Sequence, residues 1–255
     1  MTTTRENGSL YINIENKIAT IEFGHPASNS FPSELLERLK KGFQTLSEDE
    51  SVNVIILKSE GEKSFCAGAS FDELVAVESM QQGKLFFSGF ANVINAMRDC
   101  KKLIIGRIQG KTVGGGVGLA AACDYVLATE AASIKLSELS IGIGPFVIAP
   151  AVERKIGVSG LAELSLAAHE WKNAYWAKEK GLYAKVFDSI KELDNEVLHF
   201  SEKLASYNPQ ALLEMKTILW ENTASWKNLL HERAAISGEL VLSEFTKQAL
   251  SRFKK

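Results

Sequence analysis

Hydrophobic and polar positions alternate at the start of the chain and then follow two other patterns. Residues 10–23 alternate apolar and polar side chains on both sides of the polar triplet at 15–17, which predicts a hairpin with one buried face. Residues 31–49 carry apolar side chains at helical spacing, with Pro32 where helices favour proline. The mostly apolar segment at 52–59 predicts a strand buried on both faces.

Strand-like and helical patterns continue to alternate along the rest of the chain. The ranges that we expect to be strands are 102–110, 124–130 and 133–138. We expect one helix at 80–100 and a second, Ala-rich helix that begins at the three glycines within the segment 110–124. Everything after Val158 has helical patterning, apart from a strand-like segment at 184–190. We therefore expect an α/β (α+β) chain, with repeated strand–strand–helix units in residues 1–190 and a helical region in residues 191–255.

Composition and charge narrow the class of protein. The 255 residues are 45% hydrophobic and carry a formal net charge of −2 without blocks of like charge, so we expect a globular protein whose partner is not a nucleic acid. We expect no membrane partner either, because no stretch approaches the roughly 20 apolar residues of a membrane span and the first residues lack a signal peptide's apolar core. Three widely spaced cysteines favour neither disulfides nor a metal cluster, which fits a cytoplasmic location.

Three consecutive glycines stand where the Ala-rich helix begins. Glycine within a helix costs about 1 kcal/mol relative to alanine, so Gly114, Gly115, Gly116 and Gly118 indicate a site of close backbone approach. The first turn of a helix has free N–H groups and the positive end of the helix dipole, which favour an oxygen carrying negative charge. That oxygen would belong either to a phosphate or to a carbonyl group that becomes an oxyanion. The spacing of the glycines matches neither of the phosphate-binding motifs GxGxxG and GxxxxGK[ST], which argues against a phosphate. A third explanation is that the glycines only allow this helix to pack tightly on its neighbour.

A second turn of small residues supports the oxyanion interpretation. In "SFCAGAS", residues 64–70, a buried strand runs into Ala67, Gly68 and Ala69, which leave backbone N–H groups uncovered by side chains. Two such turns would supply the two donors of an oxyanion hole. A simple strand-to-helix connection is the alternative for this segment read alone.

The segments "SFCAGAS" and "GGGVGLAAACDYVLATEAASIKLSELSIGIGP", residues 64–70 and 114–145, resemble the crotonase (enoyl-CoA hydratase/isomerase) superfamily, in the form closest to methylglutaconyl-CoA hydratase-like members. The resemblance implies a ββα spiral core, a C-terminal helical region that trimerises, and a homotrimer or dimer of trimers. It also implies an acyl-CoA thioester as substrate, with coenzyme A part of that substrate and no separate cofactor or metal.

The resemblance also implies the positions of the site residues. The thioester carbonyl would accept hydrogen bonds from the backbone N–H groups of Ala69 and Gly115, which stabilise the developing enolate. The substrate-binding residues implied by the two motifs are Ala67, Ala69, Ser70, Phe71, Gly115 and Gly118.

One acidic residue matches the family's proton carrier and another is missing. Hydratases of the family commonly have a glutamate on the glycine helix and a second about 20 residues later. Gly118 stands at the first position and Glu138 at the second. Flanked by apolar residues, the Glu138 carboxyl would have a raised pKa, which suits proton exchange near neutral pH.

The missing acid leaves several reactions open. The first hypothesis is hydration of a short or branched 2-enoyl-CoA, with 3-methylglutaconyl-CoA as a candidate, by Glu138 alone. The alternatives are a delta-isomerase that uses one glutamate, a decarboxylating member, and a non-catalytic acyl-CoA-binding protein.

Other residues are weaker candidates for the site. The aromatic residues Phe86, Phe87 and Phe90 suggest an apolar pocket wall, although helical spacing also fits plain core. Glu73 and Glu78 are candidates for a second acid, and ordinary surface residues are the alternative interpretation for both. Asp124 ends the glycine helix, where we expect it to cap the helix or form a turn.

Overall fold

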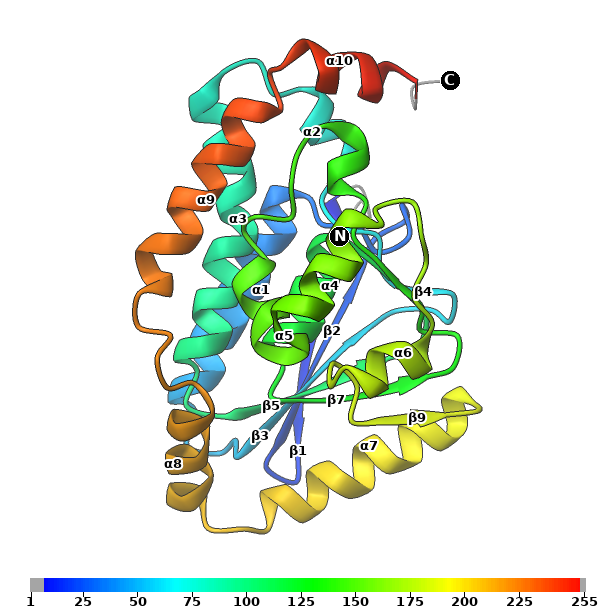
Figure 1. The fold of residues 1–255 in the computed structure, drawn as a ribbon. Coiled ribbons are helices and arrows are strands. Elements are labelled where there is room, and N and C mark those ends of the chain that lie inside the picture. The colour runs from blue at the N-terminus through cyan, green and yellow to red at the C-terminus, as the bar shows by residue number, and fades with distance from the viewer. Residues whose placement is uncertain (1–6, 253–255) are drawn as a thin grey trace.

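The computed structural model describes residues 7–252, which form a six-stranded and a three-stranded sheet with helices packed around them (Figure 1). The strands are β1 (Ser9–Glu15), β2 (Ile18–Gly24), β3 (Val54–Ser59), β4 (Ser64–Cys66), β5 (Leu103–Ile108), β6 (Lys111–Val113), β7 (Tyr125–Thr129), β8 (Ile134–Lys135) and β9 (Lys185–Phe187). The helices are α1 (Ser33–Glu48), α2 (Phe71–Val75), α3 (Met80–Asp99), α4 (Gly115–Ala122), the 3-10 helix η2 (Glu138–Ile141), α5 (Ala149–Leu166), α6 (Ala174–Glu179), α7 (Ile190–Ala205), α8 (Pro209–Leu219), α9 (Trp226–Leu240) and α10 (Glu244–Ser251).

Successive units of the chain add one strand to each sheet. The larger sheet has the order β1-β2-β3-β5-β7-β9, and the smaller has the order β4-β6-β8. Strands β3, β5 and β7 therefore lie in one sheet, and the strand that follows each of them lies in the other. This is the ββα spiral that the sequence predicts, and the expected α/β fold class is confirmed.

The opening hairpin forms where the alternating pattern places it. Strands β1 and β2 pair antiparallel with Ser9 opposite Gly24, and the tight turn has positive φ at Asn16 and Lys17. Two residues with positive φ are typical of the turn that matches strand twist in a two-residue hairpin. Every other pairing in the two sheets is parallel, so the carboxyl ends of adjacent strands lie at the same edge.

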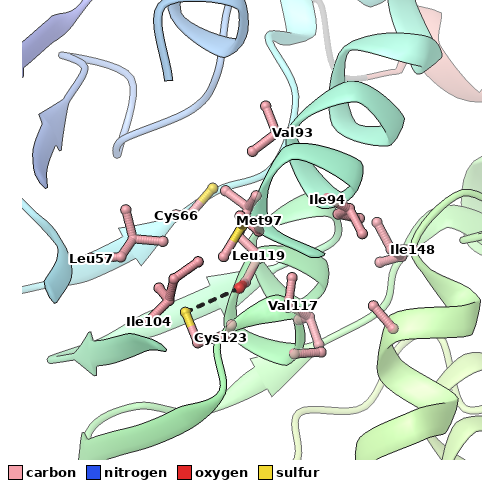
Figure 2. Close-up of a cluster of buried hydrophobic side chains, with 14 of the residues drawn as sticks. Leu57, Cys66, Val93, Ile94, Met97, Ile104, Val117, Leu119, Cys123 and Ile148 are labelled. Atoms are coloured by element: carbon pink, nitrogen blue, oxygen red, sulfur yellow. Dashed lines mark hydrogen bonds between the residues drawn. The ribbon is translucent and has the colours of Figure 1, made fainter. Parts of the chain in front are cut away.

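The main core lies between the larger sheet and the helices α1, α3 and α4. Figure 2 shows part of it, where Leu57 and Ile104 from the sheet face Met97 and Leu119 from the helices. The three cysteines, Cys66, Cys100 and Cys123, are free and buried, as expected. Burial raises the pKa of the Cys66 thiol to about 12, so this sulfur is not a nucleophile at neutral pH.

The C-terminal helices cover other surfaces of the body. Helix α7 lies on the opposite face of the larger sheet, where Leu193 and Val197 pack against Val54 and Ile105. Helix α9 packs along α3, and α10 packs on η2. The division of the chain after residue 190 stays a prediction. Within residues 7–252, no helix is both long and apolar enough to cross a membrane.

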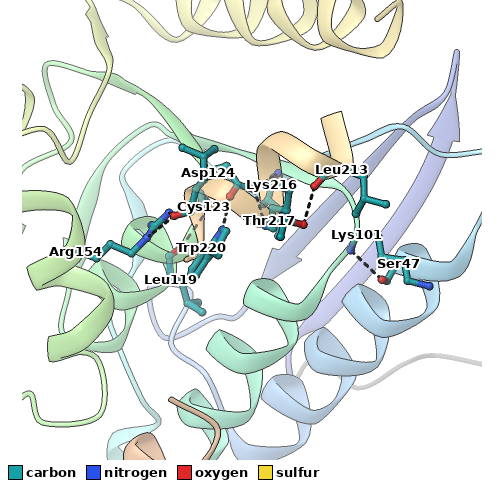
Figure 3. A network of polar contacts seen from close by, with 12 residues as sticks. Ser47, Lys101, Leu119, Cys123, Asp124, Arg154, Leu213, Lys216, Thr217 and Trp220 are labelled. Atoms are coloured by element: carbon teal, nitrogen blue, oxygen red, sulfur yellow. Dashed lines mark hydrogen bonds and ion pairs between the residues drawn. The ribbon is translucent and has the colours of Figure 1, made fainter. Parts of the chain in front are cut away.

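Asp124 has a different role from the one that the sequence suggests. Its side chain is buried and accepts hydrogen bonds from Lys216 Nζ at 2.7 Å, Trp220 Nε1 at 2.6 Å and the Ile104 backbone N–H at 2.7 Å (Figure 3). The expectation of a helix cap or a turn is therefore wrong. The carboxylate joins the end of the glycine helix to α8, and nothing local in the sequence indicates partners 92 and 96 residues away.

Candidate active site

Two backbone turns lie side by side at one edge of the three-stranded sheet. Strands β4 and β6 are parallel neighbours, with Cys66 paired to Thr112, so their carboxyl ends meet at the same edge. The small-residue turn at 67–69 follows β4, and the glycine turn at 114–115 follows β6. Sheet pairing therefore brings together two motifs that are more than 40 residues apart in the sequence.

The turns approach so closely that side chains are excluded. Gly68 has φ +94°, and a Cβ added there would stand 3.3 Å from the carbonyl oxygen of Val113 and 3.7 Å from the amide nitrogen of Gly115. Gly114 has φ +54° and precedes the first residue of α4. A Cβ on Gly115 would overlap the ring of Phe90. Close approach thus accounts for the glycines at the start of this helix.

Two amides at these turns are free to bind an oxygen atom. Among the hydrogen bonds of residues 7–252, none has the N–H group of Ala69 or Gly115 as its donor. Three neighbouring amides are occupied: Gly68 donates to Cys66 Sγ at 3.3 Å, Ser70 to the carbonyl of Phe31 at 2.9 Å and Gly114 to that of Lys135 at 3.0 Å. The amide of Gly116, like those of Ala69 and Gly115, has no acceptor among the described residues. Ala69 and Gly115 are the two donors that the family resemblance implies, and their binding of a thioester oxygen stays a prediction.

Glu138 lies against the glycine turn. Strand β8 pairs with β6, and Glu138 begins η2 soon after β8 ends, so its side chain reaches the same edge of the sheet. Its Oε1 is 2.9 Å from the point that a Cβ on Gly114 would occupy. Its Oε2 is buried without a hydrogen-bond partner. Burial raises the pKa of this carboxyl to about 7, so both protonation states are populated at neutral pH.

A cavity of about 210 Å³ joins the two turns and the carboxylate. Its walls are mostly apolar, and Glu138 is the one carboxylate among its described lining residues. None of these residues is a lysine, arginine or histidine. The apolar side chains that line the cavity are Ala67, Ala69, Phe71, Leu74, Phe86, Phe87, Phe90, Val113, Ile141, Ile143, Pro145, Val147 and Ile148.

Most of the residues singled out from the sequence meet at this cavity. Ala67, Ala69, Phe71, Gly115 and Glu138 line it, and so do the three phenylalanines of α3 that suggested an apolar wall.

Two residues of the expected substrate-binding set are not among those that line the cavity. Ser70 caps α2, where its hydroxyl accepts a hydrogen bond from the Glu73 backbone N–H at 3.4 Å. Gly118 is buried, and a Cβ there would overlap Cγ2 of Ile148, which does line the cavity. The side chain of Ile148 therefore fills the space that a side chain at position 118 would need.

Several lining residues carried no signal in the sequence. Ser237 comes from α9, and Val147 and Ile148 come from the segment before α5. The candidate second acids are elsewhere: Glu73 accepts hydrogen bonds from the backbone and hydroxyl of Ser33, and Glu78 is exposed. No group of three or more potential metal ligands occurs in the described part of the chain.

Comparison with known proteins decides the family. The enoyl-CoA hydratase/isomerase family model matches residues 13–253, nearly the whole chain. The chain belongs to this family. Acyl-CoA thioesters are the substrates of enoyl-CoA hydratase/isomerase family enzymes, and their chemistry uses no separate cofactor.

Curated relatives of this family member differ in the reaction that their names describe. The peroxisomal Δ(3,5)-Δ(2,4)-dienoyl-CoA isomerase of Arabidopsis thaliana is 29% identical over 206 residues, which cover 75% of this chain and 72% of the isomerase. The mitochondrial methylglutaconyl-CoA hydratase of Mus musculus is 31% identical over 189 residues, which cover 74% of this chain and 60% of the hydratase.

Solved structures support the same fold. The enoyl-CoA hydratase of Bacillus halodurans superposes with a TM-score of 0.87 at 19% identity, covering 95% of this chain and 99% of that one. The enoyl-CoA hydratase/isomerase family fold is therefore shown by sequence and by architecture. The choice between hydration and isomerisation depends on the site itself.

Proposed function

We propose that this enoyl-CoA hydratase/isomerase family member hydrates short 2-enoyl-CoA thioesters, using Glu138 as its one acid–base group. The observation that carries the proposal is the position of Glu138. Its carboxylate, with an unpartnered buried oxygen, lines the same cavity as the turns that carry the free amides of Ala69 and Gly115.

The reaction follows from these three groups. The thioester carbonyl oxygen accepts hydrogen bonds from the backbone N–H groups of Ala69 and Gly115. These hydrogen bonds become stronger as negative charge develops on the oxygen in the enolate. Ionised Glu138 takes a proton from water as the water oxygen bonds to C3 and the C2–C3 π electrons move to the thioester oxygen. The protonated carboxyl then returns that proton to C2, so that one water is added and Glu138 ends ionised. A pKa of about 7 suits both proton transfers.

The lining of the cavity favours an uncharged acyl group. Substrates such as 3-methylglutaconyl-CoA carry a second carboxylate, and a buried carboxylate needs a cation or several hydrogen-bond donors. The described lining residues include no cation. We therefore expect linear or branched apolar enoyl groups to be turned over faster than 3-methylglutaconyl-CoA.

Isomerisation of a 3-enoyl-CoA to its 2-enoyl isomer is the second candidate. The observation that favours it is the contact between Ile148 and Gly118, because an apolar side chain fills the position of the family's other glutamate. A second carboxylate would help to hold the attacking water, whereas one carboxylate suffices to take a proton from C2 and return it to C4. The Arabidopsis relative named an isomerase is consistent with this reaction.

Ultraviolet absorbance and mass together distinguish the two reactions. Purified protein is mixed with crotonyl-CoA, longer 2-enoyl-CoA thioesters, 3-methylglutaconyl-CoA and a 3-enoyl-CoA. Loss of the conjugated absorbance with a gain of one water supports hydration, and a gain of absorbance from the 3-enoyl substrate without a mass change supports isomerisation.

Two matched variants connect the activity to the proposed group. Glu138→Gln should abolish either reaction, while Glu78→Gln, an exposed acid outside the cavity, should leave it unchanged. If the wild-type protein turned over none of these substrates, both hydration and isomerisation would be contradicted, and a decarboxylating or non-catalytic family member would be favoured.

We further propose the homotrimer or dimer of trimers that the family resemblance implies. Light scattering of the purified protein tests this, and a monomeric mass would overturn it.

A further inference from the structure

Ile148 lies between the cavity and Gly118 of the glycine helix. It stands immediately before α5 and is only 3% exposed, and its side chain lines the cavity together with Val147 and Phe90. On its other side the same side chain lies over Gly118 of α4. One residue therefore has the cavity on one side and a helix surface without a side chain on the other.

The space beneath Ile148 exists because position 118 is glycine. A Cβ added to Gly118 would stand 2.6 Å from the Cβ of Ile148 and would overlap its Cγ2, while Ile94 Cδ1 would be 3.6 Å away. Figure 2 shows Ile94 and Ile148 next to each other beside α4, and only Ile148 is among the cavity-lining residues. Ile148 thus fills a hollow in the helix surface, and Ile94 belongs to the same buried hydrophobic cluster.

The hollow lies further along the glycine helix than the free amide of Gly115. Gly118 is three residues beyond Gly115, which places it about 4.5 Å further along the helix axis from the amide that would bind the thioester oxygen. An acyl chain that starts at the amides and follows the helix would meet Ile148 within a few carbons.

We propose that Ile148 sets the length of acyl chain that the cavity accepts, with Gly118 providing the space into which its side chain is seated. The inference rests on the proposed function in that it requires an acyl-CoA thioester to bind at the free amides. It adds a specificity-determining residue that does not take part in proton transfer.

The contact predicts opposite effects for two substitutions. Ile148→Ala removes three carbons from the cavity wall and leaves the bare helix surface behind them, so a longer chain gains room. Gly118→Ala leaves no room for the present position of Ile148 and displaces that side chain toward the cavity, so a longer chain loses room. Each additional methylene that becomes buried contributes a factor of about four in affinity.

Binding of unreactive thioesters tests the inference without relying on turnover. Dissociation constants of butyryl-, hexanoyl-, octanoyl- and decanoyl-CoA are measured by calorimetry for the wild type and the variants. We expect Ile148→Ala to raise the preference for octanoyl-CoA over butyryl-CoA by about tenfold, which corresponds to nearly two more buried methylenes. Gly118→Ala should shift the preference toward butyryl-CoA.

Matched variants keep the test interpretable. Ile148→Val removes a single carbon and should shift the preference for octanoyl-CoA over butyryl-CoA in the same direction as Ile148→Ala, by a smaller factor. It replaces Ile148→Ala in the test if that variant does not fold. Ile94→Val removes the same carbon from the neighbouring side chain outside the cavity and should leave the preference unchanged.

The possible failures are distinguishable. Folded Ile148 and Gly118 variants that bind all four thioesters with the wild-type preference would overturn the inference and leave the proposed function standing. A wild-type protein that binds none of the thioesters would overturn both.

Discussion

The carboxylate of Glu138 lies against Gly114, with Oε1 2.9 Å from the point where a Cβ on that glycine would stand. Gly114 also has φ +54°, a backbone conformation that side chains disfavour. One glycine therefore allows both the sharp entry into α4 and the approach of the proton carrier to the free amide of Gly115.

Gly114→Ala should lower kcat/KM by about a hundredfold, because the added methyl displaces Glu138 and strains the turn that presents the Gly115 amide. Steady-state kinetics on the best enoyl-CoA substrate measures the change. Gly61→Ala is the control, since Gly61 also has a positive φ, +75°, but has open space around its Cβ position. Both variants should lose stability, whereas only Gly114→Ala should lose activity. Equal activity in the two would contradict the proposed contact.

The pH dependence of kcat/KM should report the ionisation of Glu138. The reaction begins with the ionised carboxylate taking a proton, so kcat/KM should rise with pH through about 7 and then level off. The physical cause of this high pKa is the burial of the carboxyl in an apolar cavity. Initial rates between about pH 3.5 and 9 give the profile and include the ordinary ionisation range of a glutamate. A midpoint near the ordinary glutamate value of 4.5 would mean that Glu138 is solvated in the free enzyme.

Glu138 should also lower the stability of the folded protein at alkaline pH. Its pKa rises from 4.5 to about 7 on folding, so between these values the folded chain holds the proton that the unfolded chain has lost. Stability from this group is therefore fully present below pH 4.5 and is lost as the pH rises through about 7. Glu138→Gln should raise the free energy of unfolding at pH 8 by up to about 3 kcal/mol relative to its effect at pH 4. Urea unfolding at both pH values measures the difference, and a variant equally stabilised or destabilised at both would contradict it.

The buried ion pair between Asp124 and Lys216 should stabilise the attachment of α8 to the glycine helix. Both side chains are 3% exposed, so Asp124→Ala leaves a buried ammonium without its partner and should cost about 3–5 kcal/mol of unfolding free energy. Glu48→Gln breaks the exposed pair with Lys101 and should cost far less, because solvent screens this pair. Chemical denaturation compares the two. Similar costs would show that the buried pair contributes no more than a surface pair.

Local patterns were sufficient to predict the hairpin, the glycine helix and the regular alternation of strands and helices. The short strands β4, β6 and β8 are held mainly by their neighbours in the sheet, so their pairing, which brings Ala69, Gly115 and Glu138 to one edge, is a property of the whole fold. The motif resemblance supplied what periodicity could not, namely which residues at that edge carry the chemistry.

Contacts between distant segments were beyond prediction. Ile148 meets Gly118 from across a 30-residue separation, and neither residue type signals the other. The sequence around Asp124 indicates an ordinary turn residue, because its side-chain partners Lys216 and Trp220 are 92 and 96 residues away in the chain.

The interruption of α5 was also not predicted. Gly157 has a φ of +70°, which ends one helical segment, and a second segment begins after it.

The central claim is that Glu138 exchanges a proton with the α-carbon of a thioester held by the amides of Ala69 and Gly115. Hydration delivers a proton from Glu138 to C2, and the reverse of isomerisation does the same, so deuterium incorporation at C2 of an enoyl-CoA thioester tests this step directly. In deuterium oxide, the wild-type protein with its turned-over enoyl-CoA substrate should yield thioester labelled at C2, and Glu138→Gln should lower the labelling rate by about a thousandfold. Labelling by Glu138→Gln at the wild-type rate would contradict the account.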